Sequence, residues 1–232
     1  VAPNADLLSL KVASFDGAVD VSQAIAAIDW VVAHRNDNGM NVRVLNLSFG
    51  TGSTQSRILD PLSYAVEQAW KKGLVVVVAA GNDGNGVPVR TPATNKYVIA
   101  VGAANTNGTI TRTDDKVASF SNCSSTRPVD VLAPGVSIVS LRNPGSYADV
   151  NSPSAVVANR FFKGSGTSQA AAVVSGAAAV ILSKFPSATP NQVKAALKQT
   201  AQTVPTGSSA CQGSGLIRLD GIKKVFLTDE VE

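Results

Sequence analysis

Residues 74–82 read Leu-Val-Val-Val-Val-Ala-Ala-Gly-Asn. An uninterrupted apolar run of this length, rich in β-branched residues, is typical of a strand buried on both faces of a parallel sheet. Ligands of open α/β sheets bind beyond the carboxyl ends of such strands. The run ends at Ala80, and Gly81 and then Asn82 follow it. Asn82 is therefore either an ordinary turn residue or part of a site at this edge of the sheet.

Strand-like and helical patterns alternate on both sides of this run. The predicted strands lie at residues 7–12, 42–47, 97–101 and 129–132, and the predicted helices at 21–34, 61–71, 167–185 and 190–200. Such alternation indicates an α/β fold of three layers, with a mostly parallel sheet between helices on both faces. The stretch 141–163 contains two prolines and is predicted to be a long loop. A chain of 232 residues is expected to form one domain.

A second apolar segment begins with a serine. Residues 166–179 read Gly-Thr-Ser-Gln-Ala-Ala-Ala-Val-Val-Ser-Gly-Ala-Ala-Ala, which predicts a buried helix of small residues. Its first turn would carry Ser168, where the free N–H groups and the helix dipole favour negative charge. A reaction that develops an oxyanion would be stabilised there. Thr and Ser are also ordinary helix caps, so the tripeptide alone does not separate a nucleophile from a cap.

The whole segment 166–176 resembles the nucleophile segment of the subtilisin-like serine proteases, the subtilases. Their usual form is Gly-Thr-Ser-Met-Ala-(Ala/Ser)-Pro-His-Val-(Ala/Ser)-Gly. This chain departs from that form at Gln169, Ala172 and Val173, none of which is the nucleophile. Further stretches follow in the family's order: Val-Ala-Pro-Asn-Ala at 1–5, Asn-Leu-Ser-Phe-Gly at 46–50, Ala-Ala-Gly-Asn at 79–82 and Val-Leu-Ala-Pro-Gly at 131–135. The resemblance covers residues 1 to about 205.

The resemblance implies a serine endopeptidase. Ser168 would attack a peptide carbonyl and form an acyl-enzyme, and the Asn82 amide and the Ser168 N–H would stabilise the oxyanion. It also implies the residues that contact a polypeptide substrate. Backbone groups of Ser48, Phe49 and Gly50 would pair with the extended substrate, Gly17 and Ala18 would form the opposite wall, and Ala79, Ala80, Gly81 and Gly166 would line the specificity pocket.

Arg90 falls near the floor of that pocket in the alignment with the family. A guanidinium there would favour acidic or polar substrate side chains. The alternative is a solvated arginine, since arginine side chains are mostly exposed. Gly17 likewise has the alternative of a simple turn after Asp16.

The chain lacks two parts of the family's catalytic triad. The family's order is Asp, His, Ser, and the serine needs a base that a carboxylate orients. Both lie upstream of the segment that begins this chain, and the only histidine, His34, ends a predicted helix that the resemblance places away from the cleft. We expect residues 1–232 to be the later portion of one peptidase domain, without its first strands and histidine helix, and inactive alone. A non-catalytic peptide-binding or scaffold protein is the alternative, and acyl transfer is a third possibility.

Charge and hydropathy limit the classes of binding partner that the chain is expected to have. The net charge is +4 and no Lys/Arg cluster with interleaved aromatic residues occurs, which argues against nucleic acid, and no segment predicts a membrane span. The expected partners are a polypeptide substrate and the missing N-terminal part of the same domain. Cys123 and Cys211 are predicted to form a disulfide, with two free thiols as the alternative; a bridge would suit a secreted protein. No cofactor is evident. Structural calcium is implied only by the resemblance, since no acidic cluster has ligand spacing.

Overall fold

The structure, a computed structural model, describes residues 1–222 and is built around a five-stranded sheet. Strands β1 to β4 are neighbours in that order, and β5 also pairs with β3. Every pairing is parallel except that of β3 with β4. The strands are β1 (Val44–Leu47), β2 (Val75–Ala79), β3 (Ile99–Asn105), β4 (Lys116–Val117) and β5 (Val131–Pro134). The apolar run of the sequence is β2, and all five of its residues are buried.

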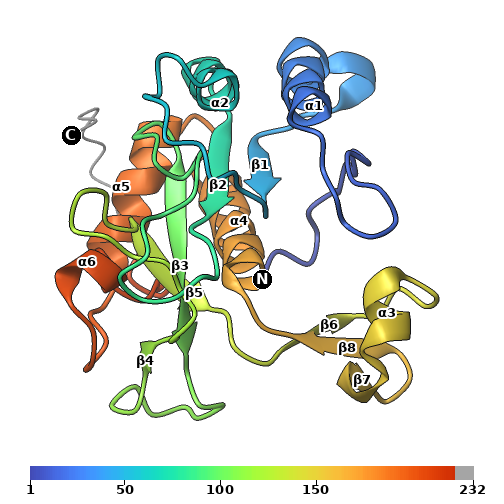
Figure 1. The fold of residues 1–232 in the computed structure, drawn as a ribbon. Coiled ribbons are helices and arrows are strands. Elements are labelled where there is room, and N and C mark those ends of the chain that lie inside the picture. Colours follow the sequence, from blue (N-terminus) through green and yellow to red (C-terminus); the bar gives the residue numbers. More distant parts are fainter. Residues whose placement is uncertain (223–232) are drawn as a thin grey trace.

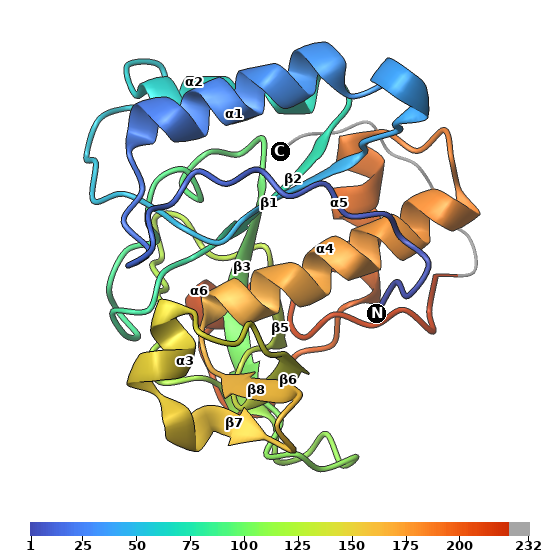
Figure 2. The ribbon, with the colours of Figure 1, turned by 90° about the vertical axis from the view of Figure 1, so that its right-hand side faces the viewer.

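Helices cover both faces of this sheet, which confirms the predicted three-layer α/β fold. Figure 2 shows the sheet between α1 and α2 on one side and α4 on the other. The helices of the body are α1 (Val21–His34), α2 (Pro61–Lys71), α4 (Thr167–Lys184), α5 (Pro190–Thr200), the short α6 (Ser209–Gln212) and the 3-10 turn η1 (Asp37–Gly39). Side chains cap the starts of three of them: Asp20 caps α1, Asp60 caps α2 and Thr189 caps α5.

Helix α4 lies along the sheet because its buried face is made of small residues. Its buried alanines, with no exposed surface, are Ala170, Ala171, Ala177 and Ala178. Side chains of this size let the helix backbone approach β1, β2, β3 and β5 closely. This packing places the start of α4 at the carboxyl edge of the sheet.

The predicted strand at residues 7–12 is wrong. No strand forms there, and Leu7 is 94% exposed. A strand needs a neighbour for its backbone hydrogen bonds, and within the described residues β1 pairs only with β2. The apolar pattern was present, but the partner it requires was not. Two other strands are shifted: β3 and β5 each begin and end later than predicted, at Ile99–Asn105 and Val131–Pro134.

The predicted long loop is also wrong, because it forms an arm with its own secondary structure. The arm, residues 138–164, projects from the body (Figure 1). It consists of β6 (Ile138–Leu141), α3 (Tyr147–Asn151), η2 (Pro153–Ala155), β7 (Val156–Val157) and β8 (Phe161–Gly164). Strand β8 pairs with β6 and β7, and Arg142 donates to both carboxylate oxygens of Asp149 at 2.6 and 2.9 Å. Contacts between short elements therefore stabilise the arm.

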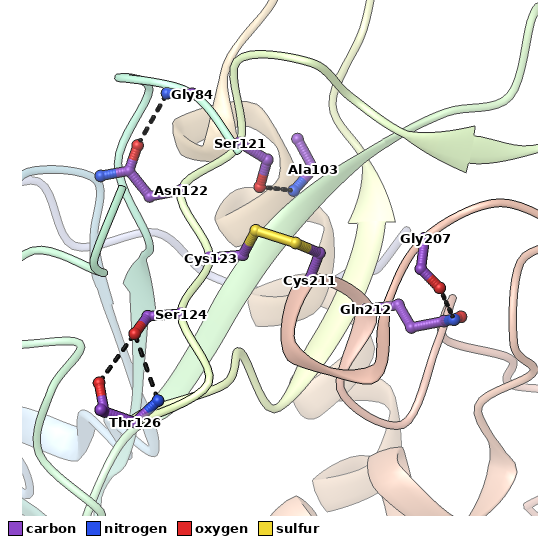
Figure 3. Close-up of a disulfide and its surroundings, with 10 residues drawn as sticks. All are labelled: Gly84, Ala103, Ser121, Asn122, Cys123, Ser124, Thr126, Gly207, Cys211 and Gln212. Carbon is purple, nitrogen blue, oxygen red and sulfur yellow. Dashed lines mark hydrogen bonds between the residues drawn. A yellow bond between two sulfur atoms is a disulfide. The ribbon is translucent and has the colours of Figure 1, made fainter. Parts of the chain in front are cut away.

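A disulfide joins Cys123 to Cys211, as predicted, across 88 residues of sequence. Figure 3 shows the bridge between α6 and the loop that carries Ser121 and Asn122. Nearby, the Ser121 hydroxyl accepts a hydrogen bond from the Ala103 N–H at 3.1 Å. The bridge thus fixes the C-terminal corner of the described chain to the loop beyond β4.

Replacing both cysteines by alanine should lower the free energy of unfolding. Closing a loop of this length restricts the unfolded chain and is worth about 4 to 5 kcal/mol on a chain-entropy estimate. Urea denaturation of the double variant measures the loss, and the reduced wild-type protein should show a similar loss. A difference under about 1 kcal/mol would contradict a stabilising role for the bridge.

Candidate active site

The first turn of α4 meets the segments that follow β1 and β2 at the carboxyl edge of the sheet. Ser48 follows β1, Asn82 lies three residues after the end of β2, and Ser168 is the second residue of α4. This is the edge at which parallel sheets bind ligands. Three segments far apart in sequence are thus brought together.

Ser168 is fixed by a reciprocal pair of hydrogen bonds. Its hydroxyl donates to the Ser48 carbonyl oxygen at 3.1 Å, and the Ser48 hydroxyl donates to the Ser168 carbonyl oxygen at 3.2 Å. The Ser168 N–H belongs to the first turn of α4 and donates to no acceptor within residues 1–222. The side chain is therefore held at the positive end of a buried helix, with a free backbone donor beside it.

Asn82 caps α4 from outside the helix. Its Oδ1 atom accepts hydrogen bonds from the Thr167 N–H at 2.8 Å and from the Thr167 hydroxyl at 3.0 Å. The residue at the N-cap itself, Gly166, has no side chain to perform this role. Because the oxygen end of the amide is engaged, the NH₂ end is directed elsewhere, and it has no partner in the described part of the chain. Ser168 and Asn82 thus share one edge of the molecule.

The segment after β1 has free backbone donors. Within residues 1–222 the N–H groups of Phe49 and Gly50 donate to no protein acceptor, while Thr51 pairs with Thr91 through bonds of 2.7 and 3.2 Å. Ala79 and Ala80 are buried at the end of β2. Gly81 donates to the Thr167 hydroxyl at 3.2 Å. A β-carbon placed on Gly166 would lie 3.5 Å from the Asn82 Nδ2 atom. Of the predicted substrate residues, Ser48 is bonded to Ser168 and Gly81 to the neighbouring Thr167, and the roles of all of them remain predictions.

Gly17 and Ala18 form a turn that no described hydrogen bond connects to this edge. The Ser14 N–H donates to the Ala18 carbonyl at 2.9 Å, and Gly17 has a φ of 90°. A positive φ of this size suits glycine. The neighbouring Phe15 contacts Tyr147 of the arm edge-to-face, with ring centroids 6.2 Å apart. The turn and the arm therefore lie together, and the predicted contact of Gly17 with substrate is still a prediction.

His34 cannot serve Ser168 as a base in this arrangement. Its Nδ1 atom lies 2.7 Å from the Asp37 carboxylate, and its ring lies against Trp30 at 4.8 Å between centroids. The carbonyl of Arg35, next to His34, accepts a hydrogen bond from the Val42 N–H, two residues before β1 begins. Ser168 instead contacts Ser48, one residue after β1 ends. Six extended residues span roughly 20 Å. Figure 2 likewise places the end of α1 and the start of α4 at opposite ends of the molecule.

Arg90 is not a free cation, and neither sequence-based interpretation anticipated its partner. Its Nε and Nη2 atoms each donate to one oxygen of Asp83, both at 2.8 Å. Hydrogen bonds from Arg90 and then from Asn122 lower the pKa of Asp83 to about 2. Asp83 and the role of Thr167 were not predicted from the sequence. The sequence signal that could have identified them is their position: Asp83 directly follows Asn82, and Thr167 directly precedes Ser168.

Neither a metal cluster nor a membrane span occurs in the described part of the chain. Residues 1–222 contain no group of three His, Cys, Asp or Glu side chains that could hold a metal ion. None of the helices in that range is both long and apolar enough to cross a bilayer.

Comparison with known proteins agrees with this geometry. The sequence model of the subtilase family matches residues 1–215. Serine protease AprX of Bacillus subtilis is 36% identical over 227 residues, covering 94% of this chain and 51% of that protein. Subtilisin DY of Bacillus licheniformis is 35% identical over 223 residues, covering 95% of this chain and 69% of that protein. The solved structure of sphericase superimposes with a TM-score of 0.77 at 27% identity, covering 94% of this chain and 70% of that one.

The chain spans about half the length of several curated relatives. The matched share is 51% of AprX and 49% of Subtilisin E of Bacillus subtilis. What those proteins do as a whole is therefore a matter of proposal for these 232 residues.

Proposed function

Because this chain belongs to the subtilase family, we propose that it supplies the nucleophile and the oxyanion donors of a secreted serine endopeptidase. The observation that carries the proposal is the Asn82 cap. Its oxygen is bonded to Thr167, the residue before Ser168, and its Nδ2 atom would lie 3.5 Å from a β-carbon on Gly166, so the NH₂, free among the described residues, is held at the start of α4. A pure scaffold has no physical need for an oriented amide donor there. The disulfide supports an oxidising, extracellular location.

The chemistry follows from the positions of these groups. An extended polypeptide would pair with the free N–H groups of Phe49 and Gly50. The Ser168 oxygen would then bond to the scissile carbonyl carbon, while a base takes the hydroxyl proton. The Asn82 NH₂ and the Ser168 N–H would donate to the resulting oxyanion. Departure of the amine, which takes up that proton, leaves an acyl-enzyme that water hydrolyses.

The base and its orienting carboxylate would come from residues outside these 232. The Ser168 hydroxyl donates to a backbone carbonyl, which does not activate it. His34 lies at the other edge of the sheet. Residues 1–232 would then form part of a single catalytic domain. Structural calcium stays a prediction of the family resemblance.

Labelling with a fluorophosphonate probe tests the proposal. We expect the full-length gene product to become labelled at Ser168. The isolated 232 residues should show no labelling above background, since an unassisted serine hydroxyl is a weak nucleophile. Labelling of the isolated chain at Ser168 would defeat the inference that the base lies elsewhere. If neither protein is labelled and neither cleaves casein, the non-catalytic peptide-binding alternative replaces the proposal.

A further inference from the structure

Arg90 fills the space between two of the predicted substrate-binding glycines. A β-carbon placed on Gly50 would lie 2.7 Å from the Arg90 Cβ atom, and one placed on Gly81 would lie 2.9 Å from its Cγ atom. A β-carbon on Gly52 would lie 3.0 Å from the Arg90 Nη1 atom. The two carbon–carbon distances, at Gly50 and Gly81, are shorter than van der Waals contact allows. The arginine stem therefore lies against the backbone of the segments that follow β1 and β2, the two segments whose Ser48 and Gly81 are bonded to the first turn of α4.

The charged end of Arg90 is neutralised in place. Asp83 accepts both of its hydrogen bonds, and the Asp83 Oδ2 atom also accepts one from the Asn122 Nδ2 atom at 2.9 Å. Asn122 is completely buried and in turn accepts from the Asp83 N–H at 2.6 Å. Since the pKa of Asp83 is lowered to about 2, the carboxylate is ionised at any neutral pH. The pair is thus anchored to the core and has no net charge.

We propose that the Arg90–Asp83 pair makes the site selective for a small, uncharged side chain at the residue whose carbonyl Ser168 attacks. This inference rests on the proposed function and names its substrate class. The arginine stem occupies volume that a large aromatic side chain would need. The paired guanidinium offers no net charge to attract an acidic or a basic side chain. The acidic preference that the sequence suggested for Arg90 would appear only if Asp83 were neutral.

Four peptide substrates that differ only at the attacked residue, with Ala, Phe, Glu or Lys there, test the proposal. The measurement is kcat/KM for each, with the full-length gene product. Wild type should prefer Ala to Phe by about tenfold or more, within the range that pocket size alone can give. Arg90→Ala removes the stem and should raise the Phe-to-Ala ratio about ten- to a hundredfold.

Asp83→Asn separates charge from volume because it keeps the arginine stem. The unpaired guanidinium should raise the Glu-to-Ala ratio by about tenfold and lower the Lys-to-Ala ratio, with the Phe-to-Ala ratio unchanged. Because the Arg90 and Asp83 side chains are each 39% exposed, salt should screen the guanidinium, and the increase in the Glu-to-Ala ratio should be smaller at high salt. Asp220→Asn is the matched control. It breaks the exposed Arg218–Asp220 pair, which has no contact with this edge, and should change none of the ratios.

Binding to the Ser168→Ala variant separates this inference from the proposed function. Isothermal titration calorimetry with the same four peptides ranks them without catalysis. The Ala peptide should bind more tightly than the Phe peptide, and adding Asp83→Asn should tighten the Glu peptide. If the Ser168→Ala variant shows that ranking while the full-length protein with Ser168 intact neither cleaves peptides nor takes the probe, the protease function is rejected and the selectivity is kept. The selectivity would be overturned if wild type and Arg90→Ala both cleaved the Ala and Phe peptides equally well. It would also be overturned if none of the four peptides bound to Ser168→Ala.

Discussion

Replacing Ser168 by alanine should lower peptide hydrolysis by the full-length gene product about a million-fold and abolish fluorophosphonate labelling. A loss of this magnitude is the one measured when the nucleophile of a subtilisin, a relative of this chain, is removed. The physical reason is that the Ser168 hydroxyl lies beside its own N–H, which is free among the described residues, whereas the other hydroxyl in the first turn of α4, that of Thr167, is buried and donates to Asn82. The measurements are kcat for a peptide substrate and mass spectrometry of the labelled peptide.

A second serine of the same helix provides the matched control. The Ser175 hydroxyl donates to the Asn46 Oδ1 atom at 3.0 Å and to the Ala171 carbonyl at 2.9 Å, two turns further along α4. Ser175→Ala should therefore label and hydrolyse within a few-fold of wild type. If Ser168→Ala kept its labelling while Ser175→Ala lost it, the nucleophile would have been assigned to the wrong serine.

The parts of the fold that sequence predicted best are those with long, uniform patterns. The valine run of β2 contains no polar residue that would face solvent, so the sequence predicted a strand buried on both faces. The small residues at 170–179 similarly predicted a helix in close contact with the sheet, and α4 is that helix. At the site, the contact of Asn82 with Thr167, the residue before Ser168, agrees with the positions of Asn82 and Ser168 at the ends of these two elements.

The predictions that were wrong or incomplete share a physical cause. In each case the contact that determines the local structure is made by residues distant in sequence, or is missing. Residues 7–12 carry a strand pattern, but in the described chain β1 offers them no pairing. In the arm, the hydrogen bonds from Arg142 to Asp149 and the pairing of β6 with β8 stabilise elements too short to show a period. The Arg90–Asp83 pair spans seven residues and depends on Asn122 from another loop. No local pattern reports such contacts.

Changing Asn82 to aspartate should lower kcat about 100- to 1000-fold with little change in KM. A loss of this size is known for the corresponding donor of a subtilisin. Aspartate has nearly the same shape and keeps an oxygen that can accept both hydrogen bonds from Thr167, at 2.8 and 3.0 Å in wild type. It loses only the NH₂ donor. The oxyanion then faces a carboxylate oxygen in place of that donor, so the penalty appears in the transition state and not in substrate binding.

The aspartate variant is chosen because it separates catalysis from folding. A carboxylate at the start of α4 is favourable for the helix dipole, so thermal stability should be equal to or above that of wild type. Thr167→Ala provides the opposite case: it removes one bond to Asn82 and the acceptor of the Gly81 N–H, and should lower stability while leaving the donor in place. A large loss of kcat in Asn82→Asp without loss of stability would identify the amide as an oxyanion donor. A kcat within about tenfold of wild type would instead make Asn82 a structural cap alone, and the oxyanion would depend on the Ser168 N–H.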